Sequence, residues 1–391
     1  MPEYVEEHDK RTSEKDPTDP NRYIGLAIAE NKLVWDLLEP QINRERHVPE
    51  RSAGYDDMIG SEQFRTTVAS FASERVWGRT VEANEVITLA GAGSILEMLF
   101  YTLGDPGEAV LVPTPSYAGF WADIETRDAL HIIPAHTNPD DDFALSVNAL
   151  QAAYDSAQVP VRALLLTNPA NPTGRIHSDD EIRDAIGWAR SVGLHVVVNE
   201  VYALSAYSDT PFIPAGTIID DIDDDVHFVW AFSKDFAMSG FRCGVMTSTN
   251  DDLRAAISEL AYWSSVSGDT QHLLDSMLQD NVWVEGYLAE MQTRLRDSYG
   301  RTSGALTDAG IPFFPADAGL FLLCDLRKFL LEATWDAEQA LWRRILEGAN
   351  VNLTPGSACH IGEPGFMRLC FAQEPADVVV DAVERVASVL S

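Results

Sequence analysis

With 391 residues, 46% of them hydrophobic and 23% charged, the chain is long enough for two domains around a sizeable core. Its net charge of −33 disfavours nucleic acids and anionic membrane surfaces as partners, because their phosphates would be repelled. No apolar run reaches the length of a membrane span, and the charged start "MPEYVEEHDKRTSEKD" lacks an apolar signal region, so we expect a cytoplasmic protein. The four cysteines form no CxxC pair and the histidines show no ligand spacing, so neither disulfides nor a metal site is predicted.

Seven β-rich segments alternate with helical patterns through the first two thirds of the chain. The predicted strands are "VITLAG" (86–91), "AVLVPTP" (109–115), "HIIPAH" (131–136), "ALLLTNP" (163–169), "HVVVNEVY" (195–202), "VHFVWAFS" (226–233) and "GVMTST" (244–249). The predicted helices are 61–76, 94–103, 117–128, 145–156 and 178–191, the last with a capping box from Ser178 to Glu181. Apolar strands that alternate with helices are typical of a mostly parallel sheet covered on both faces. The loop between the last two strands is too short for a crossover helix, so that pair should be antiparallel or separated in space.

The pattern changes after about residue 250 and predicts a second domain. Long helical patterns cover 251–263, 270–280 and 283–305, and further helices are expected near 336–348 and 375–390, after "PFFPADAGLFLLCDLR" (312–327). We therefore predict an α/β fold with two parts. Residues 51–285 should form a three-layer α/β/α domain with a mostly parallel seven-stranded sheet. Residues 286–391 should form a smaller α+β domain, joined by a loop-rich N-terminal arm, residues 1–50.

Polar residues collect where the predicted strands end, which is where sheets of this kind bind ligands. "HVVVNEVY" ends in Asn199 and Tyr202, and "TNPANPTG" (167–174) brings Asn171 into the loop after its strand. "PTPSYAGF" (113–120) places Tyr117 after another strand, as a flat surface on which a ring could stack. Each of these segments alone indicates only a loop or core packing. Their occurrence together, at the ends of several strands, is what indicates a binding site.

Two further loops add positive charge and free amides. "AGAGSILEM" (90–98) leads through Gly93 into a helix at Ser94, and amides at a helix N-terminus attract phosphate. In "AFSKDFAMSGFRCG" (231–244), Lys234 directly follows an apolar strand, where partial desolvation should lower its pKa and favour Schiff-base chemistry. Arg242 follows eight residues later, and its guanidinium suits phosphate. The combined set fits an aromatic aldehyde cofactor that carries a phosphate.

These motifs resemble the fold-type-I pyridoxal 5'-phosphate (PLP) enzymes of the aspartate aminotransferase superfamily, and within it the 1-aminocyclopropane-1-carboxylate (ACC) synthases. The similar segments run from about residue 24 to 372 and include "GLAIAENKLVWDLL" (25–38), "GYDDMIGSEQFR" (54–65), "TNPANPTG", "FSKDFAMSGFRCG" and "TPGSACHIGEPGFMRLCFA" (354–372). The resemblance implies a homodimer with PLP at active sites on the subunit interface and an amino acid as substrate.

The resemblance also implies a role for each matching residue. Lys234 would bond covalently to PLP and later move the substrate's α-proton, with Tyr202 as the second catalytic residue. The implied cofactor contacts are Gly93, Ser94 and Arg242 to the phosphate, Tyr117 to the ring face, Asn171 and Tyr202 to the phenolate oxygen, Asn199 to the ring nitrogen, and Ser233 and Tyr55 nearby. For the substrate, Arg368 would bind the carboxylate, Asn171 would assist, and Glu30 would lie near the distal end.

Three positions depart from the family pattern. An aspartate normally pairs with the protonated pyridine nitrogen, but this chain has Asn199, and Glu200 should point to the opposite face of the strand. A carboxylate beside a pyridinium is worth on the order of 4 kcal/mol at an effective dielectric of about 20, most of which an amide forfeits. Ala231 stands where a phosphate-binding serine is usual, and Met58 where a tyrosine reaches the neighbouring subunit. Three explanations of Asn199 are open: it is an engineered change, it is natural in a specialised enzyme that needs less electron withdrawal, or the chain has lost catalysis.

Three functions are compatible with these residues. The first is a PLP enzyme that acts on S-adenosylmethionine or a similar amino acid with a γ-leaving group, by α,γ-elimination to a cyclopropane or by γ-elimination and γ-replacement. The second is a PLP-dependent aminotransferase. The third is a non-catalytic protein that keeps the fold as a binding module.

Overall fold

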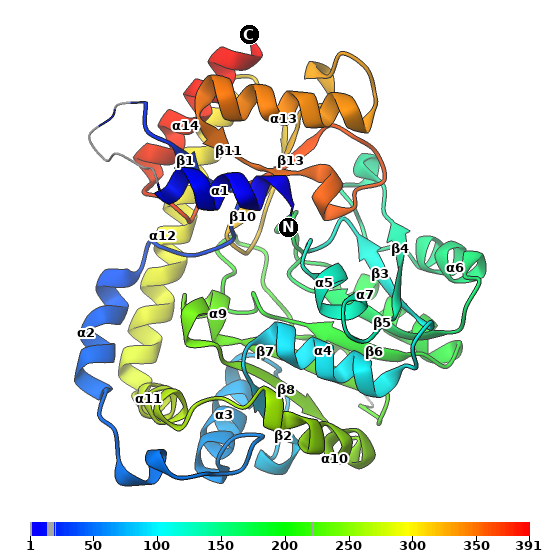
Figure 1. Cartoon of the computed structure of the whole chain (residues 1–391), viewed down its shortest axis with the longest axis vertical. Helices are drawn as coiled ribbons and strands as arrows, with labels where there is room; N and C mark the ends of the chain where they lie inside the picture. The colour runs from blue at the N-terminus through cyan, green and yellow to red at the C-terminus, as the bar shows by residue number, and fades with distance from the viewer. Residues whose placement is uncertain (1, 14–18, 20, 220–221) are drawn as a thin grey trace.

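A seven-stranded sheet forms the centre of the larger part of the molecule in the computed structural model, which describes residues 2–13, 19, 21–219 and 222–391 (Figure 1). Its strand order is β2 (Val86–Leu89), β8 (Gly244–Ser248), β7 (Val226–Ala231), β6 (His195–Asn199), β5 (Val161–Thr167), β3 (Ala109–Thr114) and β4 (His131–His136). The pairs β7–β6, β6–β5, β5–β3 and β3–β4 are parallel, whereas β8 is antiparallel to both of its neighbours. The prediction of a mostly parallel sheet is confirmed. Of the two arrangements expected for the last two strands, the structure has the antiparallel one.

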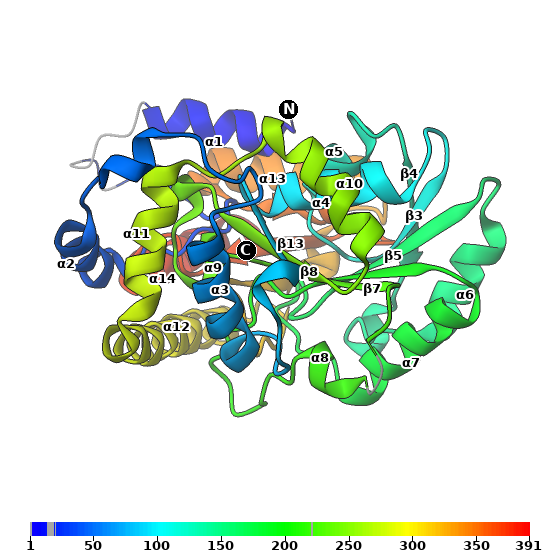
Figure 2. The same cartoon turned by 90° about the horizontal axis from the view of Figure 1, so that it is seen from below.

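Both faces of this sheet are buried under helices, which explains why its strands are apolar without alternation. In β6, Val196 and Val198 belong to one hydrophobic cluster and Val197 to the other. One face is covered by α4 (Ala92–Leu103), α5 (Phe120–Glu125) and α10 (Asp251–Leu260). The other is covered by α3 (Glu62–Arg75), α6 (Val147–Ser156), α7 (Asp179–Ser191) and α8 (Ala215–Ile218). Figure 2 shows α4 and α10 on one side of the sheet and α7 and α8 on the other, as the predicted three-layer architecture requires.

The capping box at the start of α7 is present as predicted. Ser178 Oγ accepts from the amide of Glu181 at 3.3 Å, and Glu181 Oε2 accepts from the amide of Ser178 at 2.8 Å. These two bonds satisfy amides that the first helical turn leaves without intrahelical partners.

A smaller part of the molecule is built on a second sheet, as predicted. Its four antiparallel strands are β12 (Thr354–Pro355), β13 (Phe366–Cys370), β10 (Phe321–Asp325) and β9 (Phe313–Phe314). Helices α13 (Trp335–Ala349) and α14 (Ala376–Leu390) pack beside this sheet at the top of Figure 1. The long helix α12 (Asn281–Asp308) runs down one side of the molecule towards α11 (Gly268–Gln279). α12 is continuous through residue 285, the predicted boundary between the two domains. The domain boundaries at 50 and 285 remain predictions.

The N-terminal arm contains more helix than the loop-rich arm we expected. α1 (Glu3–Ser13) and α2 (Trp35–Glu45) lie within it, and β1 (Ile24–Gly25) pairs in parallel with β11 (Val351–Asn352) of the smaller part. Pro40 lies inside α2, and such a residue normally argues against a helix. Tertiary packing overrides this signal, because α2 buries Leu38 and Ile42 in the main hydrophobic cluster.

The remaining described elements are short. Four-residue α9 (Phe232–Asp235) follows β7 directly. The 3₁₀ segments are η1 (Glu50–Ala53), η2 (Ala83–Glu85), η3 (Pro139–Asp141), η4 (Ser239–Phe241), η5 (Ala261–Trp263), η6 (Arg327–Phe329) and η7 (Gly356–Cys359). Within the described ranges, no helix is long and apolar enough to cross a membrane.

Candidate active site

The carboxyl ends of the parallel strands open onto a cavity of about 220 Å³. Thr167 at the end of β5, Asn199 at the end of β6 and Ala231 at the end of β7 line its floor, since neighbouring parallel strands end at the same edge of the sheet. The predicted site residues among its lining are Gly93, Tyr117, Asn171, Asn199, Tyr202, Ser233, Lys234 and Arg242. Eight residues predicted from five separate loops therefore share one cavity.

Lys234 carries the amine of this cavity on α9, one turn beyond the end of β7. Its Nζ donates to the backbone oxygen of Ala29 at 2.6 Å. Burial, helped by the nearby positive charge of Arg368, lowers the pKa of Lys234 to about 8. A substantial fraction of the amine is then neutral near physiological pH, and the neutral form is the nucleophile.

Arg242 and the N-terminus of α4 form the positive end of the cavity. Arg242 Nη1 donates to the Ser239 oxygen at 2.8 Å and Nη2 to the Ala90 oxygen at 3.2 Å, directly before the helix. A Cβ atom on Gly91 would stand 2.3 Å from Nη2, and the φ of Gly91 is +98°, so only glycine fits there. The amides of the first turn, at Gly93 and Ser94 among others, have no acceptor within the helix. The Ser94 side chain turns back to the Ala90 oxygen at 3.2 Å and is not part of the lining.

Arg368 of β13 reaches this site from the smaller sheet. Its Nη1 donates to Asn171 Oδ1 at 2.9 Å, and its Nη2 donates to the Ala27 oxygen at 2.6 Å and to Thr354 Oγ1 at 3.2 Å. The guanidinium lies 5.1 Å from the ring centre of Phe321, and its Nε has no partner among the described residues. Arg368 does not line the 220 Å³ cavity itself, but through Asn171 it is fixed at its edge.

Asn199 places a neutral amide where the resemblance implies a carboxylate. It is 4% exposed, and its Oδ1 has no hydrogen-bond partner among the described residues. Glu200 points away from the cavity, as predicted: its Oε1 accepts from the amide of Ala215 at 2.8 Å, and burial raises its pKa to about 8. Glu200 therefore cannot supply the charge that Asn199 lacks.

Two aromatic residues complete the lining. Tyr117 meets Phe120 edge-on with 5.4 Å between ring centres and stays 42% exposed, which leaves a ring surface free. Tyr202 is 2% exposed and packs at 90° against Phe321. Burial raises the pKa of Tyr202 well above its ordinary value, so the phenol keeps its proton and acts as a donor.

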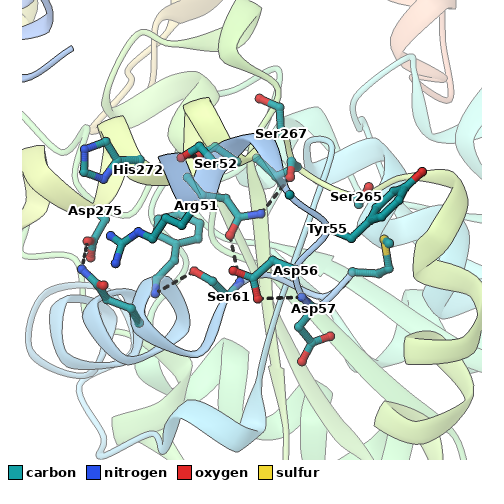
Figure 3. Close-up of a pocket in the computed structure, with 17 residues that line it drawn as sticks. Arg51, Ser52, Tyr55, Asp56, Asp57, Ser61, Ser265, Ser267, His272 and Asp275 are labelled. Carbon is teal, nitrogen blue, oxygen red and sulfur yellow. Dashed lines mark hydrogen bonds between the residues drawn. The ribbon is translucent and has the colours of Figure 1, made fainter. Parts of the chain in front are cut away.

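Besides Ser94 and Arg368, two further predicted residues, Glu30 and Tyr55, lie outside the cavity lining within this chain. Glu30 accepts from Ser239 Oγ at 3.2 Å and so touches the lining indirectly. Tyr55 is 95% exposed and lines a separate cavity of about 180 Å³ with Met58 (Figure 3). Tyr55 lies at the opposite end of that cavity from His272 (Figure 3). Its proposed contact with a cofactor in a neighbouring subunit remains a prediction.

Several lining residues were missed by sequence reasoning. Phe120 and Asp123 come from α5, about one and two turns after the predicted Tyr117, and Ser239 comes from η4. Phe120 and Ser239 lie in the strand-end segments 113–120 and 231–244, but nothing in those segments marked their side chains as part of the lining. Asp123 lies beyond them, and only the packing of α5 against α4 brings it to the cavity.

Asp235, also missed, holds the segment that carries Lys234. It is fully buried, its Oδ2 accepts from the Leu204 amide at 3.1 Å and Trp230 Nε1 at 2.8 Å, and its Oδ1 accepts from Ser205 Oγ at 2.6 Å. These bonds join α9 to the turn that follows Tyr202. Asp235 is therefore a positioning residue for both Lys234 and Tyr202.

We expect Asp235→Ala to lower the free energy of unfolding by about 3 kcal/mol or more, because three buried donors lose their acceptor. Asp235→Asn should cost about 1 kcal/mol, since one amide oxygen can serve Leu204 and Trp230 while the Ser205 hydroxyl rotates to accept. Denaturant unfolding of both variants checks this order. Equal losses for alanine and asparagine would contradict the assigned hydrogen bonds.

The positive charge of the cavity stands out in a chain of net charge −33. Lys234 and Arg242 line it, and Arg368 lies at its edge. In the described part of the chain, no group of three or more histidine, cysteine or acidic side chains could hold a metal ion. The site is therefore suited to an anionic ligand with a group that reacts with an amine.

Comparisons with known proteins agree with this geometry. The chain is 33% identical over 390 residues to a 1-aminocyclopropane-1-carboxylate synthase of Malus domestica, covering 93% of this chain and 82% of that protein. It is 34% identical over 387 residues to the synthase of Glycine max, covering 94% and 80%. The fold superposes on an aspartate aminotransferase of Thermus thermophilus with a TM-score of 0.85 at 19% identity, covering 100% and 97% of the two chains.

The family model described as aminotransferase class I and II matches residues 23–386, which include every element that builds the cavity. Members of this family depend on PLP, act on amino acids and are typically dimeric. With the fold, the cavity and this match in agreement, the chain belongs to the aminotransferase class I and II family.

Proposed function

We propose that the chain is a PLP-dependent enzyme that acts on an amino acid with a leaving group on its γ-carbon, and that S-adenosylmethionine is the favoured substrate. The reaction would be an α,γ-elimination that closes a three-membered ring, or a γ-elimination followed by γ-replacement. The similarity to 1-aminocyclopropane-1-carboxylate synthases over more than nine tenths of the chain supports the substrate class. The observation that carries the proposal is the low-pKa amine of Lys234 in one cavity with Arg242 and beside Arg368.

The residues of the cavity fit PLP. Lys234 offers an amine to the aldehyde, Arg242 and the first-turn amides of α4 offer donors to the phosphate, and Tyr117 offers a ring face. The Oδ1 of Asn199 has no partner among the described residues, so it is free to meet a ring nitrogen. When bound, the cofactor supplies an electron-withdrawing ring that stabilises negative charge on the substrate's α-carbon.

The protein's own side chains would bind the substrate and move its proton. The Arg368 fork would take the carboxylate as a bidentate pair, and Asn171 and Phe321 hold that fork in place. This binding would direct the α-proton towards Lys234 Nζ, whose pKa of about 8 suits a general base near neutral pH. Tyr202 would remain protonated throughout and donate to the cofactor's oxygen. Glu30, held by Ser239, would lie beyond the reacting atoms, near the distal end of the substrate.

Release of methylthioadenosine from S-adenosylmethionine tests this proposal. The protein loaded with PLP should release it, and the Lys234→Ala variant should not. No release would contradict the proposed substrate. If an amino donor instead yields a 2-oxo acid, and another 2-oxo acid reverses the change, the protein is an aminotransferase. If borohydride fixes no cofactor on Lys234, the non-catalytic alternative is favoured. The homodimer, the interfacial role of Tyr55 and the cytoplasmic location also remain part of the proposal.

Asn199→Asp should destabilise the cofactor-free protein by about 1–3 kcal/mol, because a carboxylate would replace an amide whose Oδ1 meets no donor. Burial raises the carboxyl pKa, so the loss should be small near about pH 4 and grow as the pH rises above it. PLP should reduce this difference in stability, because its ring nitrogen can be protonated and pair with the new carboxylate. Thermal unfolding of the wild type and the variant, with and without PLP, measures the difference in stability. Asn148→Asp, at an exposed position, is the control.

The same variant tests the catalytic consequence of the amide. We expect aspartate to accelerate exchange of the substrate's α-proton with solvent deuterium, because a protonated ring withdraws electrons more strongly. A slower exchange in Asn199→Asp would show that the amide belongs to the native mechanism.

A further inference from the structure

Asp123 is an acidic side chain in the cavity that the proposed mechanism does not use. It lies on α5, which packs against α4, and it lines the cavity together with Gly93 and Arg242. A Cβ atom on Gly93 would stand 3.2 Å from Asp123 Oδ1 and 3.6 Å from Oδ2. The absence of a side chain on Gly93 therefore allows the carboxyl group to lie against the first turn of α4.

The carboxyl group of Asp123 is partly buried, and burial and nearby charges, but no hydrogen bond from the described residues, act on it. Burial raises its pKa to about 6, while the charge of Arg242 opposes this rise and Glu97 of α4 adds to it. Tyr117 and Asp128 also interact with it, and Arg127, which pairs with Glu97, is the other cation nearby. The pKa of Asp123 therefore lies close enough to neutral pH for the charge of a bound anion to change its protonation.

The position of Asp123 conflicts with an ionised phosphate ligand. Arg242 and the amides of α4 attract a dianion to the same corner of the cavity that the Asp123 carboxylate occupies. Two like charges in contact favour protonation of one of them. Ala231 lines the cavity without a polar side-chain atom, so a protonated carboxyl would add a donor there.

We propose that Asp123 binds the phosphate group of the ligand as a neutral acid: it takes one proton from the solvent as the phosphate enters and donates it in a hydrogen bond to a phosphate oxygen. This inference rests on the proposed use of PLP. It makes cofactor binding weaker at higher pH, since the proton becomes harder to obtain. Because Asp123 would contact the phosphate and not the ring, its effect should be seen with PLP and be absent with a ligand that lacks the phosphate.

The test compares PLP with pyridoxal, which lacks the phosphate, over about pH 6.5 to 8.5, where the free phosphate is doubly charged. For the wild-type chain, the ratio of the Kd for PLP to the Kd for pyridoxal should rise with pH by up to about tenfold per unit. In Asp123→Asn, the ratio should lose this rise, because the amide carries no titrating proton. Asp184→Asn is the control: Asp184 is exposed on α7, which covers the opposite face of the sheet from α5, and its variant should keep the rise.

A second measurement uses the wild-type chain alone. In weakly buffered solution near about pH 7.5, PLP should cause uptake of up to about one proton more than pyridoxal does. Equal uptake, or an unchanged pH dependence in Asp123→Asn, would overturn the role of Asp123 while leaving cofactor binding intact. If neither compound becomes attached to Lys234, the proposed function fails first, and this inference fails with it.

Discussion

Lys234→Ala should abolish covalent attachment of PLP and reduce turnover by at least about 10³-fold, because the variant loses both the nucleophile and the proposed base. In the wild-type chain, borohydride should fix the cofactor on a peptide that contains Lys234. The rate of attachment should rise with pH and level off above about 8, where the amine is mostly neutral.

The control for this experiment is Lys328→Ala. Lys328 is exposed, lies outside the cavity lining, and donates from its Nζ to the Gly310 oxygen. That variant should keep both attachment and turnover. The Lys234→Ala protein should be at least as stable as the wild type, since it loses a buried amine whose charged form is disfavoured by burial and by the charge of Arg368. Covalent labelling of Lys234→Ala by PLP and borohydride at the wild-type level would contradict the assignment of the amine.

Arg368→Lys should raise the KM for an amino acid substrate by about 10²-fold and change kcat less, because a point charge cannot replace the planar fork. In the structure, Asn171, Ala27 and Thr354 hold the fork, and an ammonium group cannot reach these acceptors and a carboxylate together. The variant should also lose discrimination between the amino acid and the amine that lacks its α-carboxylate.

Binding of the two compounds, followed by cofactor absorbance, measures this discrimination directly. Arg343→Lys, at an exposed arginine that pairs with Glu3, is the matched control and should leave it unchanged. If Arg368→Lys still prefers the carboxylated compound as strongly as the wild type, Arg368 does not bind the substrate carboxylate.

Most strands and helices could be predicted because their signals are local. β5, β6 and β7 are buried on both faces, so their sequences are apolar over several consecutive residues. The Ser178 capping box in the sequence indicates where α7 begins. α2 gave the opposite signal, since Pro40 argues against a helix and only its packing in the main cluster compensates.

The principal site residues could be predicted for a different reason. Asn199 ends a strand of the mostly parallel sheet, and Asn171, Tyr202 and Lys234 each follow one. The ends of parallel strands meet wherever the sheet forms. Asp123 and Asp235 follow no such rule. Asp123 depends on how α5 packs against α4, and Asp235 depends on three buried donors, from Leu204, Ser205 and Trp230, that the fold brings to its carboxylate.

The sequence by itself determined the order of the elements, the parallel sheet and the set of polar groups at its edge, because hydrophobic period and strand-end position are properties of neighbouring residues. Only the tertiary structure decided that Arg368 meets Asn171, 197 residues away, that Lys234 meets the Ala29 oxygen, and that Tyr55 lies in a different cavity. These outcomes depend on how the smaller sheet and the N-terminal arm pack on the larger sheet, and no local pattern encodes that packing.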